Sequence, residues 1–196
     1  MKMMRNGVRA MVVAAALGAF PAFAWGQATN AADVEEAWRL DREVEQLHEE
    51  GKYIDAIPLA ERSLAIWTKT LGKEHQRVAT ALSNLAYLYD MKGDYARAEA
   101  LSEEALAIRE KVLGPNHPDV ANSLNNVAIR HAQNGDFARA EVLLKRALAI
   151  LEAAHGDTHP HVAALLDSLA GTYERQGDFA RAEPLCQRAL AIREKM

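Results

Sequence analysis

Three histidines lie close together in the sequence and are the side chains best suited to metal chemistry. They are His155, His159 and His161, and Asp157 lies between the first two. Three imidazoles and a carboxylate are ligands that zinc or nickel accepts. However, His159 belongs to a series of histidines that recurs along the chain, and the spacing of the three fits no closed metal site. We therefore predict no metal site here.

No short catalytic signature accompanies these histidines. The chain has no GxSxG, HExxH, CxxC, GxGxxG or Walker-type loop. The common short signatures of hydrolase, metalloprotease, redox and nucleotide sites are therefore absent. Cys186 is the single cysteine, and we interpret it as a buried, unreactive thiol, with an intermolecular disulfide as the alternative. His131 stands where the repeat otherwise has Tyr89 and Tyr173, and we interpret it as a core or rim histidine. We expect no catalytic residue, no cofactor and no enzymatic activity.

The N-terminal segment has the pattern of a targeting sequence. Three basic residues precede an apolar run over residues 11–20, and small residues follow up to Ala24. This pattern predicts a secretory signal peptide over residues 1–24 and a linker over residues 25–32. Cleavage implies an exported protein, periplasmic or secreted, without a membrane span. The alternative is that the segment stays attached as a membrane anchor.

Charge limits the classes of partner. Removal of residues 1–24 leaves 20 basic and 27 acidic side chains, a net charge of −7. Nucleic acid and anionic membrane surfaces both attract basic proteins, so neither is expected as the main partner.

The rest of the chain is an internal repeat. Four glycines fall at equal intervals of 42 residues, at Gly51, Gly93, Gly135 and Gly177. A histidine recurs at the same interval, at His75, His117 and His159. The period predicts one repeat domain over residues 33–196, with units at about 33–74, 75–116, 117–158 and 159–196.

Each unit has the pattern of a helical hairpin. Apolar residues recur with a period near 3.6, as they do from Val78 to Tyr89. The repeated glycine suits the left-handed residue that ends a helix, and the aspartate after it, as at Asp94, suits the N-cap of the next. Pro118 and Pro160 suit the first turn of a helix. Such hairpins bury their apolar faces only by stacking on one another.

These residues resemble a known family. Leu-Asn-Asn-Val-Ala at 124–128, Asn-Gly-Asp-Phe at 134–137 and Ala-Leu-Ala-Ile at 147–150 are close to the pattern of the 42-residue tetratricopeptide repeat of kinesin light chains and many bacterial proteins. The resemblance covers about residues 34–196 and implies an all-α fold, a right-handed α-solenoid of four tetratricopeptide-type helical hairpins. The first unit departs most, because Lys52 replaces the capping aspartate.

The resemblance also places a peptide-binding groove along the first helix of each hairpin. Carried over by position, it selects Asn84, Tyr87, Asn122, Asn125, Asn126, Ile129, Asp167 and Arg175. Asparagine offers amide donors and an acceptor, so three of these side chains, Asn84, Asn125 and Asn126, suit a peptide main chain. The alternative is that they are ordinary solvated residues.

The charge of the groove wall favours a neutral or basic ligand. Six acidic residues face Arg42 and Arg175, namely Asp41, Glu45, Glu49, Asp90, Asp167 and Glu174. Trp38 and Tyr87 could anchor an apolar side chain.

The leading hypothesis is a non-catalytic protein-binding or peptide-binding scaffold of the cell envelope. One alternative is a structural protein that self-associates through the C-terminal hairpin, where we expect Leu185, Ala189 and Ile192 to be incompletely covered. Another is an accessory subunit of a secretion, outer-membrane assembly or polysaccharide-export complex.

Overall fold

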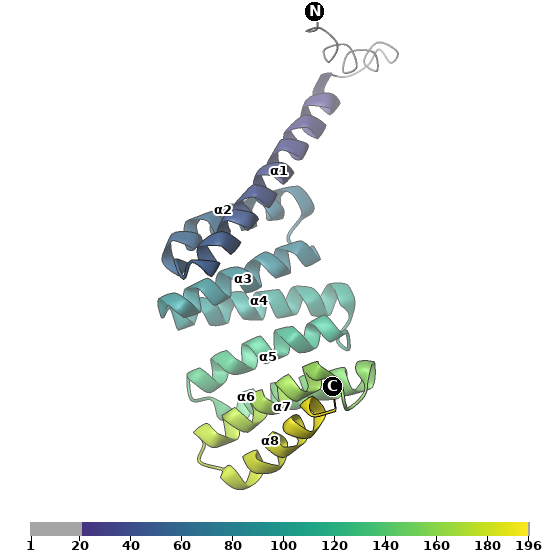
Figure 1. The fold of residues 1–196 in the computed structure, drawn as a ribbon. Coiled ribbons are helices and arrows are strands. Elements are labelled where there is room, and N and C mark those ends of the chain that lie inside the picture. Colours follow the sequence, from purple (N-terminus) through teal and green to yellow (C-terminus); the bar gives the residue numbers. More distant parts are fainter. Residues whose placement is uncertain (1–20, 196) are drawn as a thin grey trace, which may run out of the picture.

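The computed structural model describes residues 21–195, and side chains from residue 31 onwards, as a stack of antiparallel helical pairs (Figure 1). The signal-peptide prediction lies mostly outside this range. The eight helices of the described chain are α1 (Pro21–Glu49), α2 (Tyr53–Leu71), α3 (Gln76–Lys92), α4 (Tyr95–Leu113), α5 (Pro118–Gln133), α6 (Phe137–His155), α7 (Pro160–Arg175) and α8 (Phe179–Arg193).

The packing follows the order of the sequence. Each first helix packs on its own second helix, and each second helix packs on the first helix of the next pair. Figure 1 shows the pairs stacked in this order, with α1 projecting at one end and α8 at the other. The predicted right-handed α-solenoid of four helical hairpins is confirmed. Residues 25–32, expected to be a linker, are helical and continuous with α1.

Local capping chemistry sets where the helices begin and end. Gly93 ends α3 with a φ of 85°, in the left-handed region that glycine adopts without steric cost. The Asp94 side chain then accepts the backbone N–H of Arg97 at the start of α4, and the equivalent aspartates of the next two units do the same. Lys52 occupies the N-cap position of α2, and its side chain forms no capping hydrogen bond. The predicted caps are therefore confirmed. The first unit lacks the aspartate cap, as its sequence predicted.

The recurring histidines are also caps. Nδ1 of His75, His117 and His159 accepts the backbone N–H two residues later, at 3.1 to 3.2 Å. Pro118 and Pro160 follow in the first helical turn, as predicted. The repeat of histidines is thus explained by helix initiation.

Buried alanines allow close packing of the helices. Ala86 and Ala98 have no exposed surface, nor do their equivalents Ala128 and Ala140 in the next unit. The largest apolar cluster joins the third and fourth units around Leu124, and two smaller clusters hold the first and second units together. The side chains on the inner wall are therefore carried on a closely packed frame.

The last hairpin differs from expectation at two places. Cys186 is exposed, so its interpretation as a buried thiol is wrong. Its equivalent Leu144 is covered by the fourth unit, whereas no further hairpin covers α8 in the described chain. Ala189 and Ile192 are buried, contrary to the expected open face, and the exposed large apolar residues of α8 are Phe179 and Leu190 instead.

Candidate functional site: a groove between the first helices

An open groove of about 570 Å³ lies along the first helices of the first and second units. Its lining comes from α1, α3 and one residue of α5: Trp38, Asp41, Arg42, Val44, Glu45, His48, Arg77, Thr80, Ala81, Ser83, Asn84, Tyr87, Leu88 and Asn126. From Trp38 to His48 the groove follows α1 for about 15 Å, at a rise of 1.5 Å per residue. Four to five residues of an extended peptide span roughly that length.

One end of the groove is built around Trp38, which keeps 42% of its surface exposed. Its ring meets the buried ring of Trp67 edge to face, with centroids 5.4 Å apart. The guanidinium of Arg77 lies 3.8 Å from the Trp38 ring centroid, in a cation–π contact. Asp41 accepts a 3.1 Å hydrogen bond from Trp67 Nε1 and a second from the Ser63 hydroxyl. These contacts hold Trp38 in place with an exposed surface turned to solvent.

The other end of the groove is built around Tyr87, which is 38% exposed. His48 lies 5.1 Å from its ring centroid and Tyr53 lies 6.1 Å away, nearly perpendicular. Burial, followed by the neighbouring Tyr53 hydroxyl, raises the pKa of Tyr87, so its hydroxyl stays protonated and can donate a hydrogen bond. The groove therefore has an exposed aromatic side chain at each end.

The structure brings only part of the predicted set together. Asn84, Tyr87 and Asn126 line the groove. The other predicted residues do not line it: Asn122, Asn125 and Ile129 lie elsewhere on α5, and Asp167 and Arg175 lie on α7. Asn125 is half-buried, and its Oδ1 is a buried atom without a hydrogen-bond partner in the described chain. The groove residues of units three and four remain predictions.

Several acidic residues of the wall already have partners. Arg130 donates to Asp90 at 2.7 Å, with both side chains almost fully buried, and Arg193 pairs with Asp167. Asp41 accepts hydrogen bonds from Trp67 and Ser63. Three of the six wall carboxylates are thus engaged within the chain. The preference for a basic ligand now depends on the other three, Glu45, Glu49 and Glu174, which form no ion pair in the described chain.

Arg109 is a wall cation that the sequence analysis missed. It reaches from α4 to the hydroxyls of Ser83 on α3 and Ser123 on α5, at 2.9 and 2.6 Å. Burial lowers the pKa of its guanidinium, with Asp119 acting in the opposite direction, although an arginine stays charged at neutral pH. Its repeat equivalents are Trp67, Leu151 and Arg193, so the period repeats the arginine only in the fourth unit and gave a weak signal.

The histidines first considered for metal binding pack ring against ring, His155 stacked on His159 and His161 edge-on to it. The His155 and His159 ring centroids are 4.6 Å apart, and those of His159 and His161 are 5.0 Å apart. Burial, and then the charges of the two neighbours, lower the pKa of His159. Because His159 Nδ1 caps α7, its lone pair is already used. Within residues 31–195 the side chains that approach metal-ligand geometry are instead Glu99, Glu103 and His131.

Among residues 21–195, no helix is long and apolar enough to cross a membrane.

Comparison with known proteins identifies the family. A tetratricopeptide repeat model matches residues 42–111, 91–153 and 131–195. BtubC (BKLC) from P. vanneervenii is similar in structure, with a TM-score of 0.74 and 29% identity over 82% of this chain. The match spans 64% of the BtubC chain. A candidate kinesin light chain from Podosopora anserina with nearly identical repeats has a TM-score of 0.66 and 30% identity, over 78% of this chain and 72% of that one.

No curated protein matches. The repeat model nevertheless covers most of residues 42–195. This chain belongs to the tetratricopeptide repeat family.

Proposed function

We propose that this protein is a non-catalytic scaffold of the cell envelope that holds a short extended segment of another protein in the groove between α1 and α3. The observation that carries the proposal is the groove itself, with an exposed aromatic side chain at each end and polar side chains between them. Tetratricopeptide repeats are protein-interaction modules, and their fold alone does not choose the partner.

The residues of the groove define the ligand. Trp38 and Tyr87 act as anchors for apolar side chains, because large aromatic residues contribute most of the binding energy in many interfaces. Asn84 and Asn126 line the same groove and can pair with main-chain amides. Glu45 adds an unpaired negative charge. The ligand is therefore a segment of four to five residues, neutral to basic, with apolar side chains near its ends.

A matched pair of variants tests the groove. Tyr87 and Tyr95 are both exposed tyrosines, 38% and 49% respectively, but Tyr95 lies on α4 and does not line the groove. Crosslinking in an envelope fraction identifies the bound segment, and calorimetry with the matching synthetic peptide measures its affinity. Tyr87→Ala should weaken binding by about tenfold or more, and Tyr95→Ala should leave it unchanged. Equal effects of the two variants would show that the groove is idle.

The cell-envelope assignment is supported by the N-terminal pattern, with cleavage proposed after Ala24. The intact mass of the protein isolated from a periplasmic fraction measures the N-terminus directly. A mature chain that starts at Trp25 supports export and cleavage. Recovery of the uncleaved chain in the membrane pellet would favour the anchored alternative.

Self-association is a second candidate function, supported by exposed apolar residues on α8, where Phe179 is 68% exposed. Leu190 on α8 is 55% exposed, and Leu185 on the same helix is half-buried. Light scattering over a range of protein concentrations tests this role. A concentration-dependent dimer that Leu190→Glu abolishes would support it, and a monomer throughout would remove it.

A further inference from the structure

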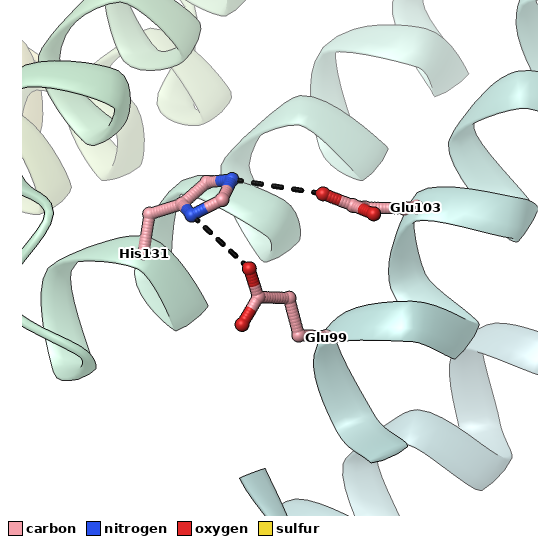
Figure 2. A group of neighbouring side chains, drawn as sticks. All are labelled: Glu99, Glu103 and His131. Carbon is pink, nitrogen blue, oxygen red and sulfur yellow. Dashed lines mark ion pairs between the residues drawn. The ribbon is translucent and has the colours of Figure 1, made fainter. Parts of the chain in front are cut away.

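A buried histidine faces two glutamates at the seam between the second and third units (Figure 2). Glu99 and Glu103 are four residues apart on α4, so their carboxylates lie on the same face of that helix. His131 comes from the last turn of α5. Its Nδ1 is 3.4 Å from Glu99 Oε1, and its Nε2 is 3.9 Å from Glu103 Oε1. One ligand atom from each residue lies within 4.8 Å of the other two.

The imidazole of His131 has no hydrogen bond within the described chain, although only 6% of its side chain is exposed. Both of its carboxylate contacts are longer than an ordinary N–H···O bond. Neither ring nitrogen is among the fully buried atoms that lack a hydrogen-bond partner in the described chain, so both are open to water or to an ion. Glu99 is already positioned, because Asn134 Nδ2 donates to its second oxygen at 2.7 Å.

The equivalent seams on either side use different chemistry. Between the first and second units the position of His131 is Tyr89, which donates to Glu61 at 2.5 Å and receives a hydrogen bond from Arg97. Glu61, which occupies the position of Glu103 in the first unit, therefore has a direct hydrogen-bond donor. Among the residues that the structure describes, no such donor reaches Glu103.

Between the third and fourth units the corresponding residue is Tyr173. There a lysine, Lys145, replaces the second glutamate and pairs with Glu141 at 2.6 Å, and Arg181 approaches the same carboxylate at 3.3 Å. In the middle seam, Arg139 pairs with Asp136 instead. Among the described residues no lysine or arginine forms an ion pair with Glu99 or Glu103. This seam alone combines an imidazole with two carboxylates that basic side chains leave free.

We propose that Glu99, Glu103 and His131 bind a divalent transition-metal ion of the zinc class. One imidazole and two carboxylates suit such ions, and water or a partner's side chain can complete the coordination. At zinc bond lengths, two ligand atoms of a tetrahedral site lie about 3.4 Å apart, close to the separation of His131 and Glu99. An imidazole binds one ion through one nitrogen, and Glu103 faces Nε2 rather than the Nδ1 that faces Glu99. Glu103 must therefore turn towards the Nδ1 side, which its 55% exposed side chain is free to do.

A bound ion would add a link between two hairpins that already meet through packing, hydrogen bonds and the Asp90–Arg130 ion pair. It would join α4 of the second unit to α5 of the third, next to the helices that carry the groove.

Zinc titration of the full chain, stripped with a chelator, tests the proposal by calorimetry at pH 7.5. The expected result is one equivalent of zinc and a higher unfolding temperature. His131→Tyr and Glu103→Lys restore the residues found at the neighbouring seam, so both should fold normally by circular dichroism. Both should lose that equivalent. Asn134→Ala, which frees Glu99, should weaken binding by about 10- to 100-fold.

A control removes the other group of histidines. His155→Ala combined with His161→Ala leaves the α7 cap intact and should keep the bound equivalent. Cobalt added in place of zinc should give a visible ligand-field spectrum that His131→Tyr removes. Zinc binding that survives His131→Tyr, or that disappears in the His155 and His161 double variant, overturns the assignment. So does the absence of binding to the wild-type chain.

Discussion

The buried ion pair between Asp90 and Arg130 gives a sharp test of how the inner wall is held together. Arg130 of α5 donates to Asp90 of α3 at 2.7 Å, and their side chains are only 8% and 14% exposed. Asp90 Oδ1 and Arg130 Nε are both buried without a hydrogen-bond partner in the described chain. The pair joins the second and third units, and its geometry leaves little room for water to replace either member.

Asp90→Asn keeps the shape of the side chain and removes its charge. Breaking a buried pair from one side costs about 3 to 5 kcal/mol, because the remaining charge stays buried without compensation. Asparagine still offers Arg130 an oxygen acceptor, so we expect about 3 kcal/mol, the lower end of that range. For a domain of this size, that loss lowers the unfolding temperature by roughly 6 to 12 °C.

Urea unfolding followed by circular dichroism measures this loss, and amide hydrogen exchange shows whether α3 and α5 open first. The matched control is Asp33→Asn. Asp33 pairs with Lys69 at 2.6 Å, and the Lys69 side chain is largely exposed. An exposed pair contributes about 0.2 to 1 kcal/mol. Asp90→Leu combined with Arg130→Met should recover most of the stability. If Asp90→Asn costs no more than Asp33→Asn, the pair is solvated and the reasoning is wrong.

Three further predictions concern the frame of the repeats. Lys52→Asp should install the missing cap of α2 and raise the unfolding temperature by about 2 to 4 °C in a thermal scan. Leu124→Ala, at a fully buried site, should cost about 2 to 5 kcal/mol in urea unfolding, whereas Val142→Ala, 66% exposed, should cost much less. The pKa of His159 is lowered in the folded chain, so its contribution to stability is present above the ordinary histidine pKa and is lost as the pH falls towards the lowered value. His159→Asn, which keeps a capping acceptor, should reduce the fall in stability measured between pH 7 and pH 5.

The sequence predicted the frame because its determinants are local. Gly93, Asp94 and Pro118 act within three residues of where they stand, through a backbone conformation or a single cap. The 42-residue period then copies that local chemistry along the chain. Helix boundaries, hairpins and their stacking follow without knowledge of any distant contact.

The wall charges were harder to predict, because long side chains reach across a seam. Asp90 and Arg130 are 40 residues apart in the sequence, and Arg193 reaches Asp167 from the opposite helix of its hairpin. Counting charges by position treated Asp90 and Asp167 as free groups for a ligand, whereas both already have a basic partner. Position in the repeat shows which helix a residue occupies, but the length and direction of a neighbour's side chain decide whether its charge is available.

Differences between the units at the same wall position also favour a ligand site at the N-terminal end of the solenoid. The position of Trp38 is occupied by Ala164 in the last unit, and the position of Tyr87 by Gly171. All four units share one backbone frame, so these positions differ mainly in what they present to the groove. Only the first two units present large aromatic surfaces, and the 570 Å³ groove lies there. A ligand that gained most of its affinity at the α7 wall would have to bind through main-chain and small polar contacts alone, and Tyr87→Ala would then leave its affinity unchanged.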